Sequence, residues 1–125
     1  MYLKLYIVDI AMCGIFGILN TECSFDVIDK SFLKGRQRGP ETSKLNNVFD
    51  KTIFGFNRLA INGLDTISDQ PIESNNCYLI CNGEIYNYKE LIKEIDYKAK
   101  TNSDCEIILH LYLKYGIEHT LNMLD

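Results

Sequence analysis

The stretch CGIFGIL, residues 13–19, decides the fold of this chain. It is a short apolar run with the length of a strand, and it predicts a buried β-strand. Its two glycines indicate that another backbone or a ligand lies close to the strand. We therefore expect a buried strand with a near neighbour at the start of the domain.

Outward from this strand, the sequence predicts one helix and further strands. Apolar residues at helical spacing follow Ser24, a suitable N-cap, and this helix is expected to end near Gly35. Residues 36–41 then predict a loop. β-branched and aromatic side chains in residues 48–61 predict one or two strands, and residues 77–81 predict another.

A turn signal follows the strand predicted at residues 77–81. Asn82 and Gly83 stand directly after it and form, taken locally, the strongest hairpin signal in the sequence. We therefore predict a hairpin that turns at this dipeptide and returns through residues 84–86.

The C-terminal part of the chain predicts helices. Two capping boxes each precede an apolar helical pattern, Asn87 with Glu90 and Ser103 with Glu106. They predict helices over residues 88–96 and 103–115, and Gly116 is expected to end the second. Residues 117–124 begin another helix, so the chain ends inside a helical pattern and the domain looks truncated.

The composition is typical of one globular domain, with 125 residues, 46% of them hydrophobic and 24% charged. Thirteen Lys and Arg against seventeen Asp and Glu give a net charge of −4, which argues against a nucleic-acid partner. No apolar stretch has the roughly 20 residues that cross a membrane. Lys4 and Asp9 interrupt the apolar N-terminus, so we do not expect it to be a signal peptide.

Five cysteines, an odd number without a C-x-x-C pair, fit neither a disulfide framework nor a zinc site. Free thiols suit a reducing compartment, so we expect a cytoplasmic protein. We expect no metal ion and no other cofactor.

Five short segments resemble, in their order along the chain, the segments of one known family. They are MCGIFGI (12–18), RGPE (38–41), RLAI (58–61), NGEIYN (82–87) and SDCE (103–106). Together they resemble the class II glutamine amidotransferase domain, and specifically the glutaminase half of asparagine synthetase. Each segment alone is weak evidence, but the ordered set covers nearly all of residues 12–125 and is highly specific.

The resemblance implies an α+β fold of the N-terminal-nucleophile hydrolase type. Such a fold is an αββα sandwich of antiparallel sheets, expected here to be incomplete at the C-terminus because the family domain continues past the position of Asp125. Residues 1–12 are expected to be an N-terminal extension that precedes the nucleophile. Residues 13–125 are expected to be the N-terminal portion of the amidotransferase domain.

The resemblance also implies a reaction, cleavage of the glutamine side-chain amide to glutamate and ammonia through a cysteine thioester. Cys13 matches the nucleophile that begins the mature family chain. Its thiol, with a reference pKa of about 8.5, needs a base, and its own α-amine at about 7.7 to 8.0 can serve. Carried over from the family, the Asn82 side-chain amide and the Gly83 backbone N–H stabilise the oxyanion.

Substrate binding is implied for a further group of residues. Arg58 offers a planar fork of N–H groups for the glutamine α-carboxylate, and Asp104 matches the family residue that binds the α-ammonium group. The resemblance also implies that Leu59, Ile61 and Asn82 bind substrate, together with Glu84 beside the site.

Each of these residues also has a purely structural explanation. Cys13 could be an inert buried thiol, and Asn82-Gly83 could be only a tight turn. Asp104 could stabilise a helix dipole, and Arg58 could stack on aromatic rings at the surface. His110, His119 and the other cysteines match no catalytic role, and we interpret them as structural.

Three departures from the family pattern bear on activity. While Met12 is joined to Cys13, the cysteine nitrogen is an amide and cannot act as a base. Glu41 stands where the family usually has Asp, and Asn57 stands where it usually has His, which removes an imidazole beside Arg58.

These observations leave two hypotheses open. In the first, the chain is a glutaminase that passes ammonia to a separate ATP-dependent synthetase subunit or to a missing C-terminal segment; without a Gly-rich phosphate loop it cannot activate aspartate itself. In the second, it is a catalytically inactive remnant or a glutamine-binding fragment of an asparagine synthetase.

Overall fold

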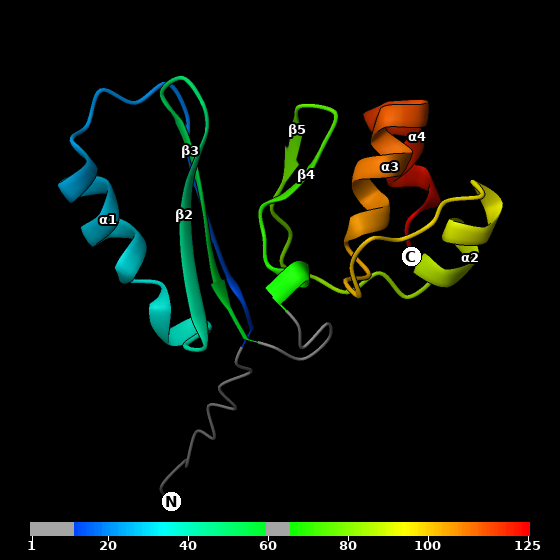
Figure 1. Cartoon of the computed structure of the whole chain (residues 1–125), viewed down its shortest axis with the longest axis horizontal. Coiled ribbons are helices and arrows are strands. Elements are labelled where there is room, and N and C mark those ends of the chain that lie inside the picture. The colour runs from blue at the N-terminus through cyan, green and yellow to red at the C-terminus, as the bar shows by residue number, and fades with distance from the viewer. Residues whose placement is uncertain (1–11, 60–65) are drawn as a thin grey trace, which may run out of the picture.

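The computed structural model describes residues 12–59 and 66–125 (Figure 1). The strands are β1 (Gly14–Ile18), β2 (Thr42–Phe49), β3 (Thr52–Arg58), β4 (Ile72–Ser74) and β5 (Cys77–Leu79). The helices are α1 (Phe25–Leu33), α2 (Tyr88–Glu94), α3 (Glu106–Tyr115) and α4 (Ile117–Met123). Short 3₁₀ turns lie at Arg36–Arg38 and Thr66–Ser68.

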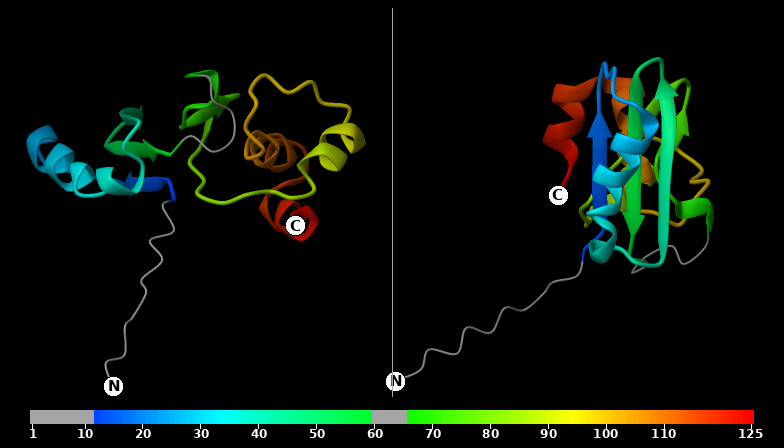
Figure 2. Two further views of the ribbon diagram at one scale, coloured as in Figure 1. Left: turned by 90° about the horizontal axis from the view of Figure 1, so that it is seen from below. Right: turned by 90° about the vertical axis from the view of Figure 1, so that its left-hand side faces the viewer.

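These elements form four layers. Helix α1 covers one face of the antiparallel sheet β1-β3-β2, the hairpin β4-β5 faces the other side of that sheet, and α2, α3 and α4 lie beyond the hairpin (Figures 1 and 2). This arrangement confirms the predicted α+β fold with its order of helix, sheet, sheet and helix. No helix within residues 12–59 and 66–125 combines the length and the apolar character that a membrane crossing requires.

The larger sheet is held to α1 by close packing. Phe32 of α1 contacts the ring of Phe16 edge-on, with 5.8 Å between the ring centroids. A Cβ atom at Gly55 would lie only 2.7 Å from the Phe32 ring, so this position of β3 requires glycine. The close neighbour predicted for β1 is found at Gly14, where a Cβ would lie 3.3 Å from Gly35 O, whereas Gly17 has ordinary space around it. The prediction that this strand is buried is wrong, because β1 is an edge strand of the sheet and Ile15 is 50% exposed.

Helix α3 packs against both the second sheet and the other two helices. Its Leu109 joins Ile72 of β4 and Cys105 in one buried cluster. On its other side, Ile107 and Leu111 are almost completely buried in a second cluster that also includes residues of α2 and of the segment before it. This packing fixes the start of α3 against the second sheet.

The predicted hairpin at Asn82-Gly83 is wrong. Strand β5 ends at Leu79 and pairs with β4, and the tight turn lies at Asn75 and Asn76, both with positive φ. Among the residues that the structure describes, no strand pairs with Cys81. The side chain of Gln70 contacts its backbone instead, accepting from the Cys81 N–H at 2.5 Å and donating to its carbonyl at 3.0 Å. Local turn chemistry could not predict this long-range contact.

The predicted capping box at Asn87 is also absent, although the helix that it predicted is present as α2. Asn87 occupies the N-cap, but its side chain donates to Met123 O at 2.7 Å and accepts from the Asp125 N–H at 3.2 Å. It therefore fixes the end of α4. Ser24 likewise occupies the N-cap of α1 without a capping hydrogen bond from its side chain.

Helix α3 begins three residues later than its predicted capping box. Cys105 is the N-cap, and the carboxylate of Glu106 accepts hydrogen bonds from Lys100 N, Thr101 N, Thr101 Oγ1 and the Tyr97 hydroxyl. The acidic residue thus reaches back to the preceding loop and fixes its path toward α3. Strand β2, which begins at Thr42, extends well before the strand region predicted to begin at residue 48.

Candidate active site

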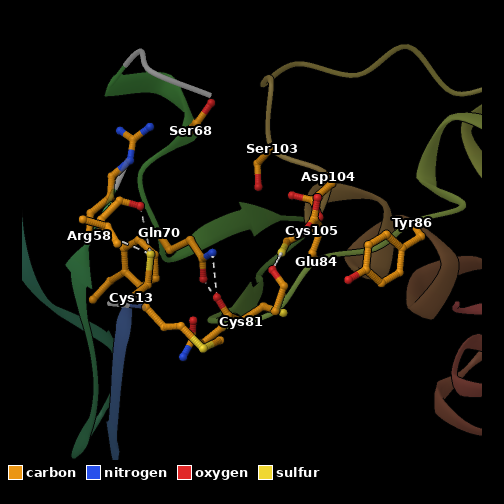
Figure 3. A pocket seen from close by; sticks show the side chains of 15 residues that line it. Cys13, Arg58, Ser68, Gln70, Cys81, Glu84, Tyr86, Ser103, Asp104 and Cys105 are labelled. Carbon is orange, nitrogen blue, oxygen red and sulfur yellow. Dashed lines mark hydrogen bonds between the residues drawn. The ribbon is translucent and has the colours of Figure 1, made fainter. Parts of the chain in front are cut away.

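A cavity of about 350 Å³ lies where the ends of β1 and β3 meet the segments around Gln70, Asn82 and Ser103 (Figure 3). It brings together all of the predicted site residues that the structure describes: Cys13, Arg58, Leu59, Asn82, Gly83, Glu84 and Asp104. The prediction for Ile61 lies outside the described residues. The segments come from both sheets and from the loop before α3, so the fold assembles the site from distant parts of the chain.

Cys13 is fixed at the entrance to β1 by the end of β3. Its thiol donates to Leu59 O at 3.3 Å, and the Leu59 N–H lies 3.3 Å from Sγ as a donor to the sulfur. The Cys13 carbonyl accepts from Arg38 Nε at 3.4 Å. Because the thiol is only half-buried and faces the cavity, a small molecule there could reach Sγ.

Arg58 is the last residue of β3 and is buried, which excludes the alternative of a surface arginine stacked on aromatic rings. Its Nη1 contacts Asp69 Oδ1 at 2.5 Å, and Lys44 Nζ contacts Asp69 Oδ2 at 2.8 Å. Burial alone would raise the pKa of Asp69, but the hydrogen bonds and charges of Lys44 and Arg58 outweigh it and hold this pKa below its usual value. The Asp69 carboxylate is therefore ionised at neutral pH.

Asn82 and Gly83 are placed by the contact between Gln70 and Cys81. Two hydrogen bonds from one side chain fix the backbone immediately before Asn82. The Gly83 carbonyl in turn accepts from the Cys105 thiol at 3.7 Å. Neither Asn82 nor Gly83 has a positive φ, so the dipeptide does not adopt the type I′ turn of the alternative interpretation.

Asp104 is buried on the opposite side of the cavity from Cys13 (Figure 3). Its Oδ2 accepts from the Ile85 N–H at 2.6 Å, which ties the loop before α3 to the segment that carries Glu84. The acidic residue in the first turn of α3 is Glu106. Asp104 therefore contacts a different segment rather than the amides at the start of α3.

This set of residues agrees with what comparison with known proteins finds. Residues 12–125 match the family described as the glutamine amidotransferase domain. The chain belongs to this family. This amidotransferase domain is 41% identical over 120 residues to the asparagine synthetase (glutamine-hydrolyzing) of Mesocricetus auratus. It is 39% identical over 120 residues to that of Homo sapiens. Each alignment covers 91% of this chain but only 21% of the relative, so the chain spans about a fifth of the length of these proteins.

Three consecutive buried residues at this amidotransferase cavity were not predicted from the sequence. Ser68 and Gln70 line the cavity, and Asp69 between them contacts Arg58. Their partners lie between 11 and 34 positions away in the sequence, so no local pattern could reveal them.

Two further thiols line the cavity beside Cys13. A hydrogen bond from Cys105 lowers the pKa of Cys81, whereas the same contact and burial raise the pKa of Cys105. All five cysteines of the domain are free thiols.

The two histidines lie against tyrosines. His110 stacks on Tyr97 with 3.7 Å between the ring centroids, and burial lowers its pKa, so it is neutral at pH 7. His119 packs on Tyr115. Within residues 12–59 and 66–125, no group of three His, Cys, Asp or Glu side chains could hold a metal ion.

Asn57, which replaces the histidine of the family pattern, does not support Arg58. It is completely buried between Gly14 and Gly35 on the face of the sheet toward α1, where it accepts from the Ser43 hydroxyl at 2.7 Å. Arg58 lies on the opposite face and contacts Asp69. The imidazole that the family has beside Arg58 is missing here, and Asp69 holds Arg58 from the other face of the sheet. At the other departure, Glu41, the backbone N–H donates to Arg58 O.

Proposed function

We propose that this domain hydrolyses the side-chain amide of glutamine to glutamate and ammonia through a thioester on Cys13. The observation that supports it most is a single cavity with a thiol, a buried arginine and a buried aspartate in its wall. A free amino acid carries one carboxylate and one ammonium group. Arg58 and Asp104 offer the two opposite charges that such a molecule requires.

The first step is attack of the Cys13 sulfur on the side-chain amide carbon. The α-amine of Cys13 accepts the thiol proton, and the C–S bond forms as the carbonyl electrons move onto the oxygen. The Asn82 side-chain amide and the Gly83 N–H donate to this oxyanion, and each such donor is typically worth about 2.7 to 4 kcal/mol. Their placement is supported by the hydrogen bonds between Gln70 and Cys81.

Collapse of the oxyanion breaks the C–N bond while the leaving nitrogen takes the proton from the α-ammonium group of Cys13 and departs as ammonia. Water then attacks the thioester and loses a proton to the same amine, the C–S bond breaks, and the amine returns that proton to the sulfur, which yields glutamate and the free thiol. Arg58 binds the substrate α-carboxylate, Asp104 binds its α-ammonium group, and Leu59 contributes the wall beside the sulfur. Glu84 adds negative charge on the side of Asp104.

The ammonia acceptor is proposed to be an ATP-dependent synthetase, either as a separate subunit or as a further segment of a longer chain. The names of the relatives support this, because they are asparagine synthetases of which this domain matches about a fifth. We place the activity in the cytoplasm, since the free thiols suit a reducing compartment.

A second candidate is a domain that binds glutamine without turning it over. It is favoured while residues 1–12 remain attached, because the nitrogen of Cys13 is then an amide and the proposed base is missing. The two candidates share a substrate and differ only in the chemistry at Cys13.

The experiment compares ammonia release by protein that begins at Cys13 with release by the 125-residue chain, with N-terminal sequencing of each preparation. We expect activity only in protein that reads Cys-Gly-Ile-Phe, and its loss in Cys13→Ala. Cys23→Ala, at an exposed cysteine away from the cavity, is the matched control and should stay active. Turnover by protein that still begins Met-Tyr-Leu would contradict the proposed base.

A further inference from the structure

Asp69 is a buried carboxylate held between two cations that come from neighbouring strands. Its side chain is 2% exposed, that of Arg58 is 6% exposed, and that of Lys44 is 47% exposed. Each carboxylate oxygen contacts a different cation. Burying a carboxylate is costly unless it is paired in this way, so the site depends on both contacts.

The register of the sheet explains why an anion is needed there. Lys44 pairs with Phe56 and Thr42 pairs with Arg58, so the two cations lie on one face of adjacent strands, on a diagonal. Like charges so close together on one face repel each other. Asp69 removes this repulsion, and it comes from outside this sheet, from the segment that leads into β4.

The residues on either side of Asp69 contact the other parts of the cavity. The Ser68 hydroxyl accepts from the Asn102 N–H at 3.2 Å, in the loop that leads to Asp104. Gln70 fixes Cys81, immediately before Asn82. One buried segment, residues 68–70, therefore joins the strand that carries Arg58 to the loops that carry Asn82 and Asp104. Its outer residues, Ser68 and Gln70, line the cavity (Figure 3).

The balance of charge in this cluster favours an anionic ligand. An Arg58-Asp69 pair alone would be neutral, but the three groups together carry one net positive charge because Lys44 also binds Asp69. The guanidinium is thus fixed in one orientation while the cluster still attracts a carboxylate. An arginine fork binds a carboxylate best when its plane is fixed in advance.

We propose that Asp69 is a positioning residue for substrate recognition: it orients Arg58 for the α-carboxylate of glutamine, and Lys44 preserves the positive charge that this carboxylate requires. The inference rests on the proposed function, because it assigns the support of the same binding site. Asp69 is not among the residues that we propose to contact the substrate.

The experiment measures binding rather than turnover, by NMR titration of the full chain carrying Cys13→Ala. The ligands are L-glutamine and L-glutaminamide, in which a neutral amide replaces the α-carboxylate. We expect Asp69→Asn to weaken glutamine binding by about tenfold or more, equivalent to at least about 1.4 kcal/mol, and to change glutaminamide binding by less than twofold. Lys44→Met should weaken glutamine binding by about two- to fivefold.

Glu22→Gln is the matched control, because it also converts an ion-paired carboxylate to an amide, in the exposed pair with Lys51. It should leave both affinities unchanged. Asp69→Glu keeps the negative charge, so its glutamine affinity should lie between that of Asp69→Asn and that of the parent protein. It is the variant to measure if Asp69→Asn does not fold.

Equal affinity for glutamine in Asp69→Asn and the parent would overturn the inference. Equal losses for glutamine and glutaminamide would also overturn it, since they would indicate a merely structural role. Absence of glutamine binding in the parent protein would instead reject the proposed function, and this inference with it.

Discussion

Two buried carboxylates, Asp69 and Glu106, are stabilised in different ways. Asp69 contacts two cations, whereas Glu106 accepts hydrogen bonds from two backbone N–H groups and two hydroxyls. Both have a pKa below the usual value despite burial, because these partners favour the charged form. Because their partners differ, the two carboxylates affect the cavity in different ways.

The charge of Asp69 acts on Arg58 at the cavity wall, so its removal changes the field that a ligand meets. The carboxylate of Glu106 is hydrogen-bonded to the loop over residues 97–101. Removal of this carboxylate therefore changes the path of the chain toward Asp104. We therefore expect loss of Glu106 to lower stability most, and loss of Asp69 to lower glutamine affinity most.

The largest effect is expected from acid, which removes both charges. The folded pKa values of Asp69 and Glu106 lie below their unfolded values of about 3.8 and 4.5, so their stabilisation is complete above this range and is lost as pH falls through the folded values. His110, whose pKa is also lowered by burial, adds to the loss below about pH 6.5. Thermal unfolding measured from pH 7 to pH 3 should show a steep fall in midpoint.

Thermal unfolding of Glu106→Gln over the same pH range separates the contribution of Glu106 from that of Asp69. Its midpoint at pH 7 should be lower than that of the parent, and its fall with acid should be shallower because one titrating group is gone. A slope identical to that of the parent would show that Glu106 does not contribute to the acid dependence.

The next effect is that of Glu106→Ala, which we expect to lower the free energy of unfolding by about 3 kcal/mol. The variant leaves the Tyr97 hydroxyl and the N–H groups of Lys100 and Thr101 without their acceptor. Urea unfolding followed by circular dichroism measures it. A loss below about 1 kcal/mol would mean that water replaces the carboxylate at little cost.

Arg58→Lys is expected to weaken glutamine binding by about tenfold, because a single ammonium cannot form the paired contacts of a guanidinium. This substitution also tests the contact with Asp69, because the single ammonium of lysine would keep only part of the contact that the guanidinium makes. Isothermal titration with the Cys13→Ala background measures the affinity. Unchanged affinity would assign Arg58 to a structural role.

The smallest of the expected effects on stability is that of Tyr97→Phe, which removes one donor to Glu106 and leaves the backbone donors in place. We expect a loss of about 1 to 2 kcal/mol, since hydrogen bonds to charged groups are stronger than neutral ones. The Tyr97 hydroxyl has a raised pKa, caused by burial and by its bond to Glu106, so it donates throughout the neutral range. Tyr112→Phe, at an exposed tyrosine of α3, is the control. It should leave the free energy of unfolding measured by chemical denaturation almost unchanged.

Strand β1, helix α1 and the C-terminal helices could be predicted because their signals are local. The resemblance to the amidotransferase family supplied the order of layers, which periodicity alone does not contain, and this order is confirmed. The roles of Cys13, Asn82 and Asp104 stay predictions. What could not be predicted depends on partners distant in the sequence, since Gln70 replaces a strand at Cys81 and Asp69 supports Arg58 from another segment.

The most direct measurement is the intact mass of protein beginning at Cys13, quenched in acid during turnover of glutamine and followed by peptide mapping. The proposed mechanism predicts a γ-glutamyl adduct on the peptide that contains Cys13, absent from Cys13→Ala and discharged when glutamine is exhausted. An adduct on Cys81 or Cys105, or ammonia release that persists in Cys13→Ala, would contradict it.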